Sequence, residues 1–181
     1  DKLASNLRDL GSVKLFFESS PAVSRETFRR FTTPLLGDGD IAAIEWLPRV
    51  ARDQRAEFET AARQEGLAEF QFTELDRDGA TVRAGERDEY FPIHYCEPYA
   101  VHAKAVGFVL SPTDPLRGPA LTRALNTGRP TLSQQHIPTL ESVPQAAVVA
   151  VQPVYEPEAV SDGEKAGRRL KGLVMGIIPV G

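Results

Sequence analysis

Phe70-Gln71-Phe72-Thr73-Glu74 is the stretch in which the periodicity of the sequence changes. Its apolar and polar residues alternate, which is typical of a half-buried β-strand. The polar run Asp76-Arg77-Asp78-Gly79 follows it, as expected for a turn between two strands. Before residue 70 the apolar residues mostly recur at three- and four-residue spacing, and after it strand-like segments predominate. The sequence therefore divides into a mainly helical first part and a strand-rich second part.

Four segments have the pattern of helices. In the first, Leu3, Leu7 and Leu10 form one apolar stripe. Ser24 is placed to cap the start of the second, and Gly128 follows the fourth, where a left-handed residue commonly ends a helix. We expect helices over about Lys2–Phe17, Arg25–Leu36, Ala51–Gln64 and Pro115–Asn126.

Seven segments are predicted to be strands, and the connections between the last ones suit antiparallel pairing. They are Ile41–Leu47, Phe70–Glu74, Tyr90–Glu97, Ala105–Leu110, Thr131–Ile137, Ala146–Tyr155 and Leu170–Pro179. A polar loop, Glu156–Arg169, is predicted between the last two. Helices followed by a block of strands indicate an α+β fold with a long N-terminal helix and a mainly antiparallel sheet. We expect an N-terminal helical segment, residues 1–36, and a strand-rich core, residues 37–181.

The composition is that of an ordinary globular protein, with 41% hydrophobic and 25% charged residues in 181. The formal net charge of -4 and the absence of a basic run argue against a nucleic-acid partner, because affinity for nucleic acid rests on neutralising phosphates. The single cysteine, Cys96, excludes an internal disulfide. The longest apolar runs, Ala146–Val151 and Leu173–Val180, are far shorter than the roughly 20 residues of a spanning helix.

The residues that most often carry chemistry do not form a recognisable catalytic pattern. His94 and Cys96 would share one face of a strand, but no second pair of metal ligands follows at a suitable spacing. No serine or cysteine lies in a known nucleophile motif, and the paired acids fall in predicted loops or at strand starts. We therefore predict no enzymatic activity, no metal and no cofactor. A metal-dependent hydrolase using His94, Cys96 and His136 is a weaker alternative.

A string of aromatic residues and prolines on predicted strands has two interpretations. The residues are Tyr90, Phe91, Pro92, Tyr95 and Tyr99. Such side chains can form the wall of a pocket for an apolar or planar ligand. They can equally be ordinary core residues, because alternate positions of a strand must fill the core.

The ordered set of motifs resembles the CHASE domain, the extracytoplasmic sensor of cytokinin-receptor kinases and of many bacterial histidine kinases and nucleotide cyclases. The resemblance begins with Phe28 and Phe31 and covers about three-quarters of the chain. Its motifs are Ile44-Glu45-Trp46-Leu47-Pro48-Arg49-Val50 with Arg55 and Phe58, Arg87-Asp88-Glu89-Tyr90-Phe91-Pro92-Ile93, Tyr95-Cys96-Glu97-Pro98, Ala105-Val106-Gly107-Phe108, Ala120–Gly128, Pro153-Val154-Tyr155 and Gly172–Gly176.

The resemblance implies a PAS-like sensor core that holds a small ligand against its sheet. Pro92 matches a proline of the pocket wall, Leu132 matches a leucine whose backbone helps hold the ligand, and Ser142 falls near a polar pocket position. Val109 stands where cytokinin-binding members have an aspartate that hydrogen-bonds the adenine ring. An unpaired buried purine nitrogen costs roughly 1 to 3 kcal/mol, so Val109 argues against cytokinin as the ligand. We expect Pro92, Val109 and Leu132 to enclose one hollow, with Tyr90 and Tyr95 in its wall.

The resemblance also implies a setting for the chain. We expect a periplasmic or extracellular domain excised from a membrane protein, with flanking transmembrane helices outside this segment and a kinase or cyclase output beyond them. An unidentified small molecule and a second copy of the chain are the expected partners. The alternative is a ligand-independent interaction or dimerisation module whose PAS-like pocket is filled by its own side chains.

Overall fold

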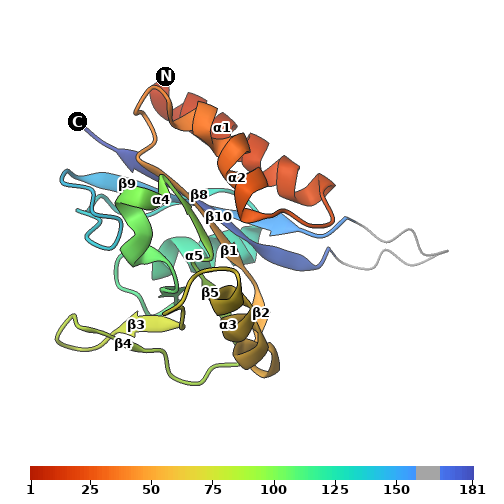
Figure 1. Ribbon diagram of the computed structural model, residues 1–181. Helices are drawn as coiled ribbons and strands as arrows, with labels where there is room; N and C mark the ends of the chain where they lie inside the picture. The colour runs from red at the N-terminus through yellow and green to blue at the C-terminus, as the bar shows by residue number, and fades with distance from the viewer. Residues whose placement is uncertain (158–167) are drawn as a thin grey trace.

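The computed structural model describes residues 1–157 and 168–181, and its centre is a five-stranded antiparallel sheet in the order β6-β1-β10-β9-β8 (Figure 1). The two longest strands, β9 and β10, are neighbours, and β1 pairs with the other edge of β10. The strands are β1 (Ala43–Pro48), β6 (Tyr95–Glu97), β8 (Thr131–Leu132), β9 (Ala147–Tyr155) and β10 (Leu170–Pro179).

Both faces of this sheet are buried, and alternate residues of its strands enter two different hydrophobic clusters. Trp46 of β1 lies opposite Val174 of β10, and both belong to the cluster beneath the N-terminal helices. The next pair along, Leu47 and Leu173, belongs to the cluster on the other face. The strict alternation follows from the two-residue repeat of a strand. A sheet covered on both faces explains why β1 reads as a nearly continuous apolar run.

Two helices, α1 (Lys2–Ser19) and α2 (Arg25–Thr32), cover one face of the sheet (Figure 1). The buried stripe of α1 ends in Leu10, Val13 and Phe17, which pack on β9 and β10. Leu10 lies so close to Gly176 of β10 that a Cβ added there would be 2.5 Å from Leu10 Cδ1. Leu10 of the predicted leucine stripe is therefore fully buried against its own domain.

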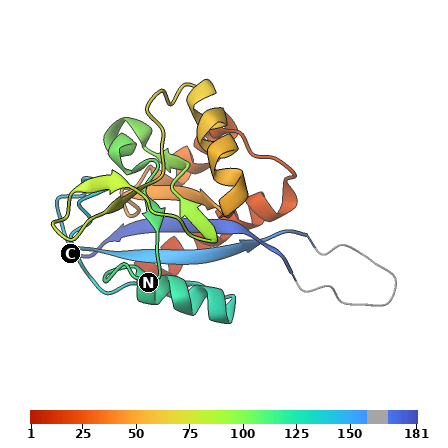
Figure 2. The same ribbon diagram turned by 90° about the horizontal axis from the view of Figure 1, so that it is seen from below.

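The other face carries α5 (Gly118–Thr127) and two small sheets. In the view of Figure 2, α5 lies on one side of the β9–β10 pair and the small sheets lie on the other. The first small sheet has the order β2-β5-β7 and the second is the β3–β4 hairpin. The remaining elements are β2 (Val50–Ala51), β3 (Thr73–Leu75), β4 (Thr81–Arg83), β5 (Glu89–Pro92), β7 (Val109–Leu110), α3 (Arg55–Gln64), α4 (Tyr99–His102) and the 3₁₀ turns η1 (Thr33–Leu36), η2 (Arg52–Gln54) and η3 (Ala103–Ala105).

The α+β class, the long N-terminal helix and the mainly antiparallel sheet predicted from the sequence are confirmed. The predicted strand Tyr90–Glu97 is in fact two strands in two sheets. Between them the Ile93 N–H donates to Phe108 O at 2.9 Å, and the His94 N–H donates to Trp46 O at 2.9 Å. The chain therefore crosses at these two residues from the small sheet to the main sheet.

Other boundaries also differ from the predicted ones. The helix predicted to start at Ala51 begins at Arg55, because Val50 and Ala51 pair with β5. The α-helix predicted to run to Leu36 ends at Thr32 and tightens into η1, where Pro34 cannot donate an α-helical hydrogen bond. The strands predicted over Ala105–Leu110 and Thr131–Ile137 are reduced to their last two and first two residues, β7 and β8.

Part of the predicted loop Glu156–Arg169 lies outside the described residues, since positions 158–167 are not among them. The proposed boundary at residue 36 stays a prediction. The helices before it share one hydrophobic cluster with β1, β9 and β10. Over the described ranges, the structure contains no helix that is both long and apolar enough to cross a membrane.

Candidate functional site

Three of the six residues predicted to bind a ligand come together on the small β2-β5-β7 sheet. Pro92 of β5 lies directly opposite Val109 of β7 in the strand register. Tyr90, two residues before Pro92, shares a hydrophobic cluster with Val109. All three side chains are buried.

The other three lie elsewhere. Leu132 is on β8, at the opposite edge of the main sheet, and packs beneath α1. Tyr95 is on β6 under α2, where its hydroxyl donates to Val23 O at 2.9 Å. Ser142 is exposed in the loop before β9 and has a positive φ of 54°. Among the described residues, Pro92, Val109 and Leu132 therefore do not enclose one common hollow, and their role in binding stays a prediction.

A hollow of about 360 Å³ lies beside Val109, between the β3–β4 hairpin and the segment that follows β7. Its apolar wall is formed by Leu75, Phe108, Val109 and Pro115. Its polar wall is formed by Glu74, Asp76, Arg77, Arg87, Ser111, Thr113 and Asp114, and Gly79 completes the lining. The volume is at the lower end of the range for small-molecule sites.

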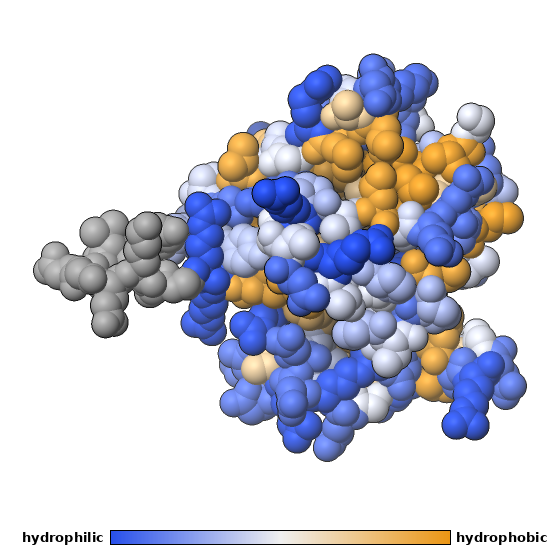
Figure 3. All heavy atoms as spheres, turned by 180° about the vertical axis from the view of Figure 1, so that it is seen from behind, coloured by the Kyte–Doolittle hydropathy of each residue, from blue (hydrophilic) through white to orange (hydrophobic). Residues whose placement is uncertain are grey.

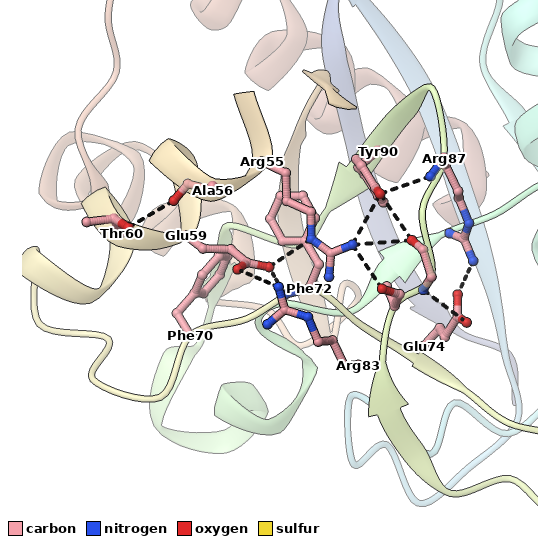
Figure 4. A network of polar contacts seen from close by, with 12 residues as sticks. Arg55, Ala56, Glu59, Thr60, Phe70, Phe72, Glu74, Arg83, Arg87 and Tyr90 are labelled. Carbon is pink, nitrogen blue, oxygen red and sulfur yellow. Dashed lines mark hydrogen bonds and ion pairs between the residues drawn. The ribbon is translucent and has the colours of Figure 1, made fainter. Parts of the chain in front are cut away.

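The polar wall is connected to a buried network around Arg55 of α3 (Figure 4). Arg55 Nη1 donates to the Tyr90 hydroxyl at 3.1 Å and to Ala84 O at 2.9 Å. The Tyr90 hydroxyl donates to Gly85 O at 3.0 Å and accepts the Arg87 backbone N–H at 2.9 Å. Tyr90 therefore fixes the backbone at Arg87, whose side chain lines the hollow.

Glu59 closes the network on the side of α3 (Figure 4). Its Oε1 accepts from Arg55 Nε at 3.0 Å and from the Phe72 N–H at 3.0 Å. Burial alone would raise the pKa of Glu59, but the Phe72 N–H and Arg55 outweigh it and hold this pKa below its ordinary value. A buried ion pair thus ties α3 to the segment that leads into β3.

Glu74 and Arg87 form an ion pair in the wall of the hollow (Figure 4). Their side chains are 28% and 29% exposed, so both remain partly open to solvent. The second carboxylate oxygen of Glu74 accepts from the Gly85 N–H at 3.4 Å. The hollow therefore presents both signs of charge next to an apolar floor. Sequence reasoning gave Arg87 no role of its own, although Arg87 lies in a motif of the resemblance.

A second polar cluster is buried deeper, on the face of the sheet that carries α5. Glu45, in the middle of β1, and Glu141 are both fully buried. Arg117 binds Glu141 through two contacts, at 2.8 and 2.7 Å, and Cys96 Sγ lies 3.7 Å from Glu45 Oε1. Burial raises the pKa of Glu45 well above its ordinary value, and the negative charge of Glu141 raises it further against the effect of Arg117. Burial and Glu141 thus favour the uncharged form of the Glu45 carboxyl, which lies beside an ion pair.

The histidines and the cysteine do not meet in a metal site. The His94 ring stacks on Tyr95 with centroids 4.4 Å apart, and burial lowers the pKa of His94 to about 3. His136 pairs with Ala147 in an isolated bridge, and Cys96 faces Glu45. No group of three or more histidine, cysteine, aspartate or glutamate side chains in the described ranges could hold a metal ion.

A larger hollow, of about 560 Å³, lies on the opposite side of the molecule. Apolar side chains gather there in the view from behind (Figure 3). Its apolar lining includes Leu3 of α1, Leu132 of β8, Val148 of β9 and Ile178 of β10. The charged residues Asp1, Lys2 and Asp40 stand at its rim, where Lys2 and Asp40 are 2.8 Å apart.

Comparison with known proteins identifies the family to which this arrangement belongs. The family model described as the CHASE domain matches residues 21–181. The chain belongs to the CHASE domain family. A CHASE domain is an extracellular sensor domain of signalling proteins, so the resemblance found in the sequence and its general function are confirmed. No curated protein matches the chain.

Proposed function

We propose that this CHASE domain is the extracytoplasmic small-molecule receptor of a membrane-bound histidine kinase or nucleotide cyclase. The observation that carries the proposal is the hollow beside Val109, which combines an apolar wall with the Glu74–Arg87 ion pair. Such a combination of apolar surface and a few placed polar groups is characteristic of small-molecule sites. The function proposed is binding alone, with the output reaction carried by other parts of the protein.

The Arg55 network supplies a connection from this hollow to the rest of the fold. A ligand that displaces Arg87 pulls on the backbone held by Tyr90, and Tyr90 contacts Arg55 at the start of α3. Val50 and Tyr90 pair in the small sheet, and Val50 follows closely on β1, which packs beneath α1. In this proposal α1 passes the change towards a transmembrane segment outside the chain. A ligand that prefers one state by about 10-fold supplies about 1.4 kcal/mol for such a switch.

Thermal denaturation of the chain against a library of small metabolites tests the receptor function. A ligand present at about 100 times its dissociation constant adds about 2.7 kcal/mol of apparent stability. Leu75→Trp places a larger side chain at the exposed wall of the hollow and is expected to abolish the shift. Val82→Trp, on the other strand of the same hairpin and outside the lining, is the matched control. A library hit unaffected by Leu75→Trp would exclude this hollow, and the absence of any hit would contradict the receptor function.

The membrane setting has its own test, which is the reading frame of the whole protein. The proposal requires an apolar segment of about 20 residues next to this domain. A whole protein without one would contradict the proposed location, whatever the outcome of ligand binding.

The larger hollow beside Leu3, with the apolar side chains that gather around it, favours a second candidate function, that of an interaction or dimerisation module (Figure 3). Its partly apolar lining and charged rim suit a protein partner as well as a ligand. In this alternative the partner is a second copy of the chain. Sedimentation of the chain and of Leu3→Asp distinguishes the two, because a dimer formed here is expected to dissociate in the variant. A monomer at high concentration would exclude this alternative.

A further inference from the structure

The charged groups that line the hollow beside Val109 are of both signs. Three are acidic, Glu74, Asp76 and Asp114, and two are basic, Arg77 and Arg87. They come from β3, from the turn that follows it, from the segment before β5 and from the segment after β7. A ligand in this hollow is therefore surrounded by several charged groups. They differ in how many hydrogen bonds and ion pairs they already make within the fold.

Part of this charge is already satisfied by the fold. Asp76 Oδ1 accepts the N–H groups of Asp78 and Ala80, each at 2.9 Å. Asp114 Oδ1 accepts the N–H groups of Leu116 and Arg117, each at 2.8 Å. In both residues one carboxylate oxygen holds a turn and the other is left without a partner among the described residues.

Among the described residues, Arg77, unlike these two aspartates, makes no polar contact that holds the fold together. It is exposed, and it has neither a hydrogen bond nor an ion pair to any other residue in the described ranges. Arg87 is satisfied on one side only, by Glu74, and its Nη1 has no hydrogen-bond partner. The hollow thus has two guanidinium groups with donors to spare next to carboxylates with acceptors to spare.

We propose that the hollow binds a small zwitterion with an apolar side chain, of the kind that an α-amino acid represents. This inference rests on the proposed receptor function. The ligand carboxylate binds Arg77 and Arg87, the ligand ammonium binds Glu74 and Asp114, and the side chain packs on the floor formed by Leu75, Phe108, Val109 and Pro115. A volume of about 360 Å³ accommodates a single such molecule.

A zwitterion is favoured because a ligand with a single charge compensates only one sign of the charges in the hollow, which costs free energy. A simple anion bound by the free donors of Arg77 and Arg87 also faces the three carboxylates of the lining and brings no cation to offset them. A simple cation on these carboxylates leaves the free donors of the two arginines without an acceptor. A molecule that carries both charges supplies an acceptor to the arginines and a donor to the carboxylates, so neither set of groups is left uncompensated. The excess of one acidic group in the lining also disfavours a plain anion.

Isothermal titration of the chain with the twenty common L-amino acids tests this inference. An amino acid with an apolar side chain, such as L-leucine, is expected to bind. Isoamylamine, which lacks the carboxylate, and 4-methylpentanoate, which lacks the ammonium group, are expected to bind about 10-fold more weakly or not at all, because each loses a charge-assisted hydrogen bond.

Two variants connect the binding to the charged wall. Arg77→Gln removes a group that has no part in the fold, so a loss of affinity for L-leucine cannot result from unfolding. Arg30→Gln on α2 is the matched control, because Arg30 is exposed, lies outside the lining and, like Arg77, has no side-chain hydrogen bond or ion pair in the described ranges. The expected result is a loss of about 10-fold or more for Arg77→Gln and unchanged affinity for Arg30→Gln.

The outcomes separate this inference from the receptor function. Equal affinity for L-leucine and its two single-charge analogues would overturn the zwitterion and leave the receptor function standing. The same holds if no amino acid binds while a neutral metabolite stabilises the chain and is blocked by Leu75→Trp. If neither amino acids nor any library compound bind, both fail.

Discussion

Replacing Glu45 by glutamine is expected to make the chain more stable at neutral pH. Glu45 is fully buried in β1, next to the Glu141–Arg117 ion pair. Its pKa is raised well above the ordinary value of 4.5, chiefly by burial and then by the charge of Glu141. A glutamine amide has the shape of the protonated carboxyl and, like it, carries a hydrogen-bond donor. The substitution therefore keeps the packing and removes the titration.

The magnitude follows from the linkage between proton binding and folding. Above pH 4.5 the unfolded chain loses the Glu45 proton while the folded chain retains it, so the wild type loses stability as the pH rises. The slope is about 1.4 kcal/mol per pH unit and continues until the pH reaches the folded pKa. The Glu45→Gln variant lacks this pH-dependent loss of stability, because glutamine does not titrate. Between the unfolded pKa and the raised folded pKa, its advantage over the wild type is expected to grow by up to about 1.4 kcal/mol per pH unit.

Urea denaturation at several pH values from 4.5 to 8 measures this difference. Glu57→Gln, on the exposed side of α3, serves as the control for replacing a surface glutamate and is expected to change the free energy of unfolding by no more than about 0.5 kcal/mol. A difference between Glu45→Gln and the wild type that stays constant, or shrinks, as the pH rises would refute the argument. In that event Glu45 would be ionised in the folded chain.

Three further changes test other parts of the fold. His94→Phe keeps a ring beside Tyr95 and removes a group whose folded pKa is about 3. Because the unfolded histidine binds a proton below about pH 6.5, the wild type should lose stability relative to the variant by up to about 1.4 kcal/mol per pH unit as the pH falls towards 3. A difference in unfolding free energy that stays the same at every pH would contradict this. Tyr90→Phe leaves the Arg87 N–H without its partner and removes one of the three acceptors of Arg55 Nη1, so a loss of about 1 to 3 kcal/mol is expected in urea denaturation, and an unchanged midpoint would argue against the network. Gly107→Ala forces a side chain onto a residue with φ of 96° and places its Cβ 2.5 Å from Gln71 O, so a loss of about 1 to 3 kcal/mol is expected, and a neutral result would mean that this backbone contact is not formed.

The features of the fold that depend on local pattern could be predicted from the sequence. The stripe of α1, the cap at Ser24 and the glycine after α5 placed these helices to within a few residues. The alternation at residues 70–74 is confirmed in burial, since Phe70 and Phe72 are buried and Gln71 is exposed. The strand itself begins only at Thr73, because a strand needs a paired neighbour. The neighbouring strand β4 pairs only with the three residues from Thr73 to Leu75. Periodicity reports which side chains are buried and not where the backbone finds a partner.

The candidate site could be predicted only in part, since it depends on residues that are distant in the sequence. Pro92 and Val109 were expected together, and they are neighbours because β5 and β7 pair. Leu132 was expected with them, but it lies on the far edge of the main sheet, and alignment to a family pattern does not fix which edge a short strand joins. Glu45 gave one signal that sequence reasoning did not use, a single acid inside an apolar strand. Its partners, Arg117 and Glu141, lie too far along the chain for spacing to reveal them.

The contact between Leu10 and Gly176 limits the ways in which α1 can move. The Leu10 side chain occupies the space on β10 that a side chain at position 176 would otherwise fill. A small slide of the helix would drive Leu10 against the larger neighbours of that glycine, Val174 and Ile178. Displacements of α1 are therefore restricted to steps, either together with β10 as one body or by about one helical turn, roughly 5.4 Å, to a new seat. A signal carried by this helix would arrive as a switch between two positions and not as a graded shift.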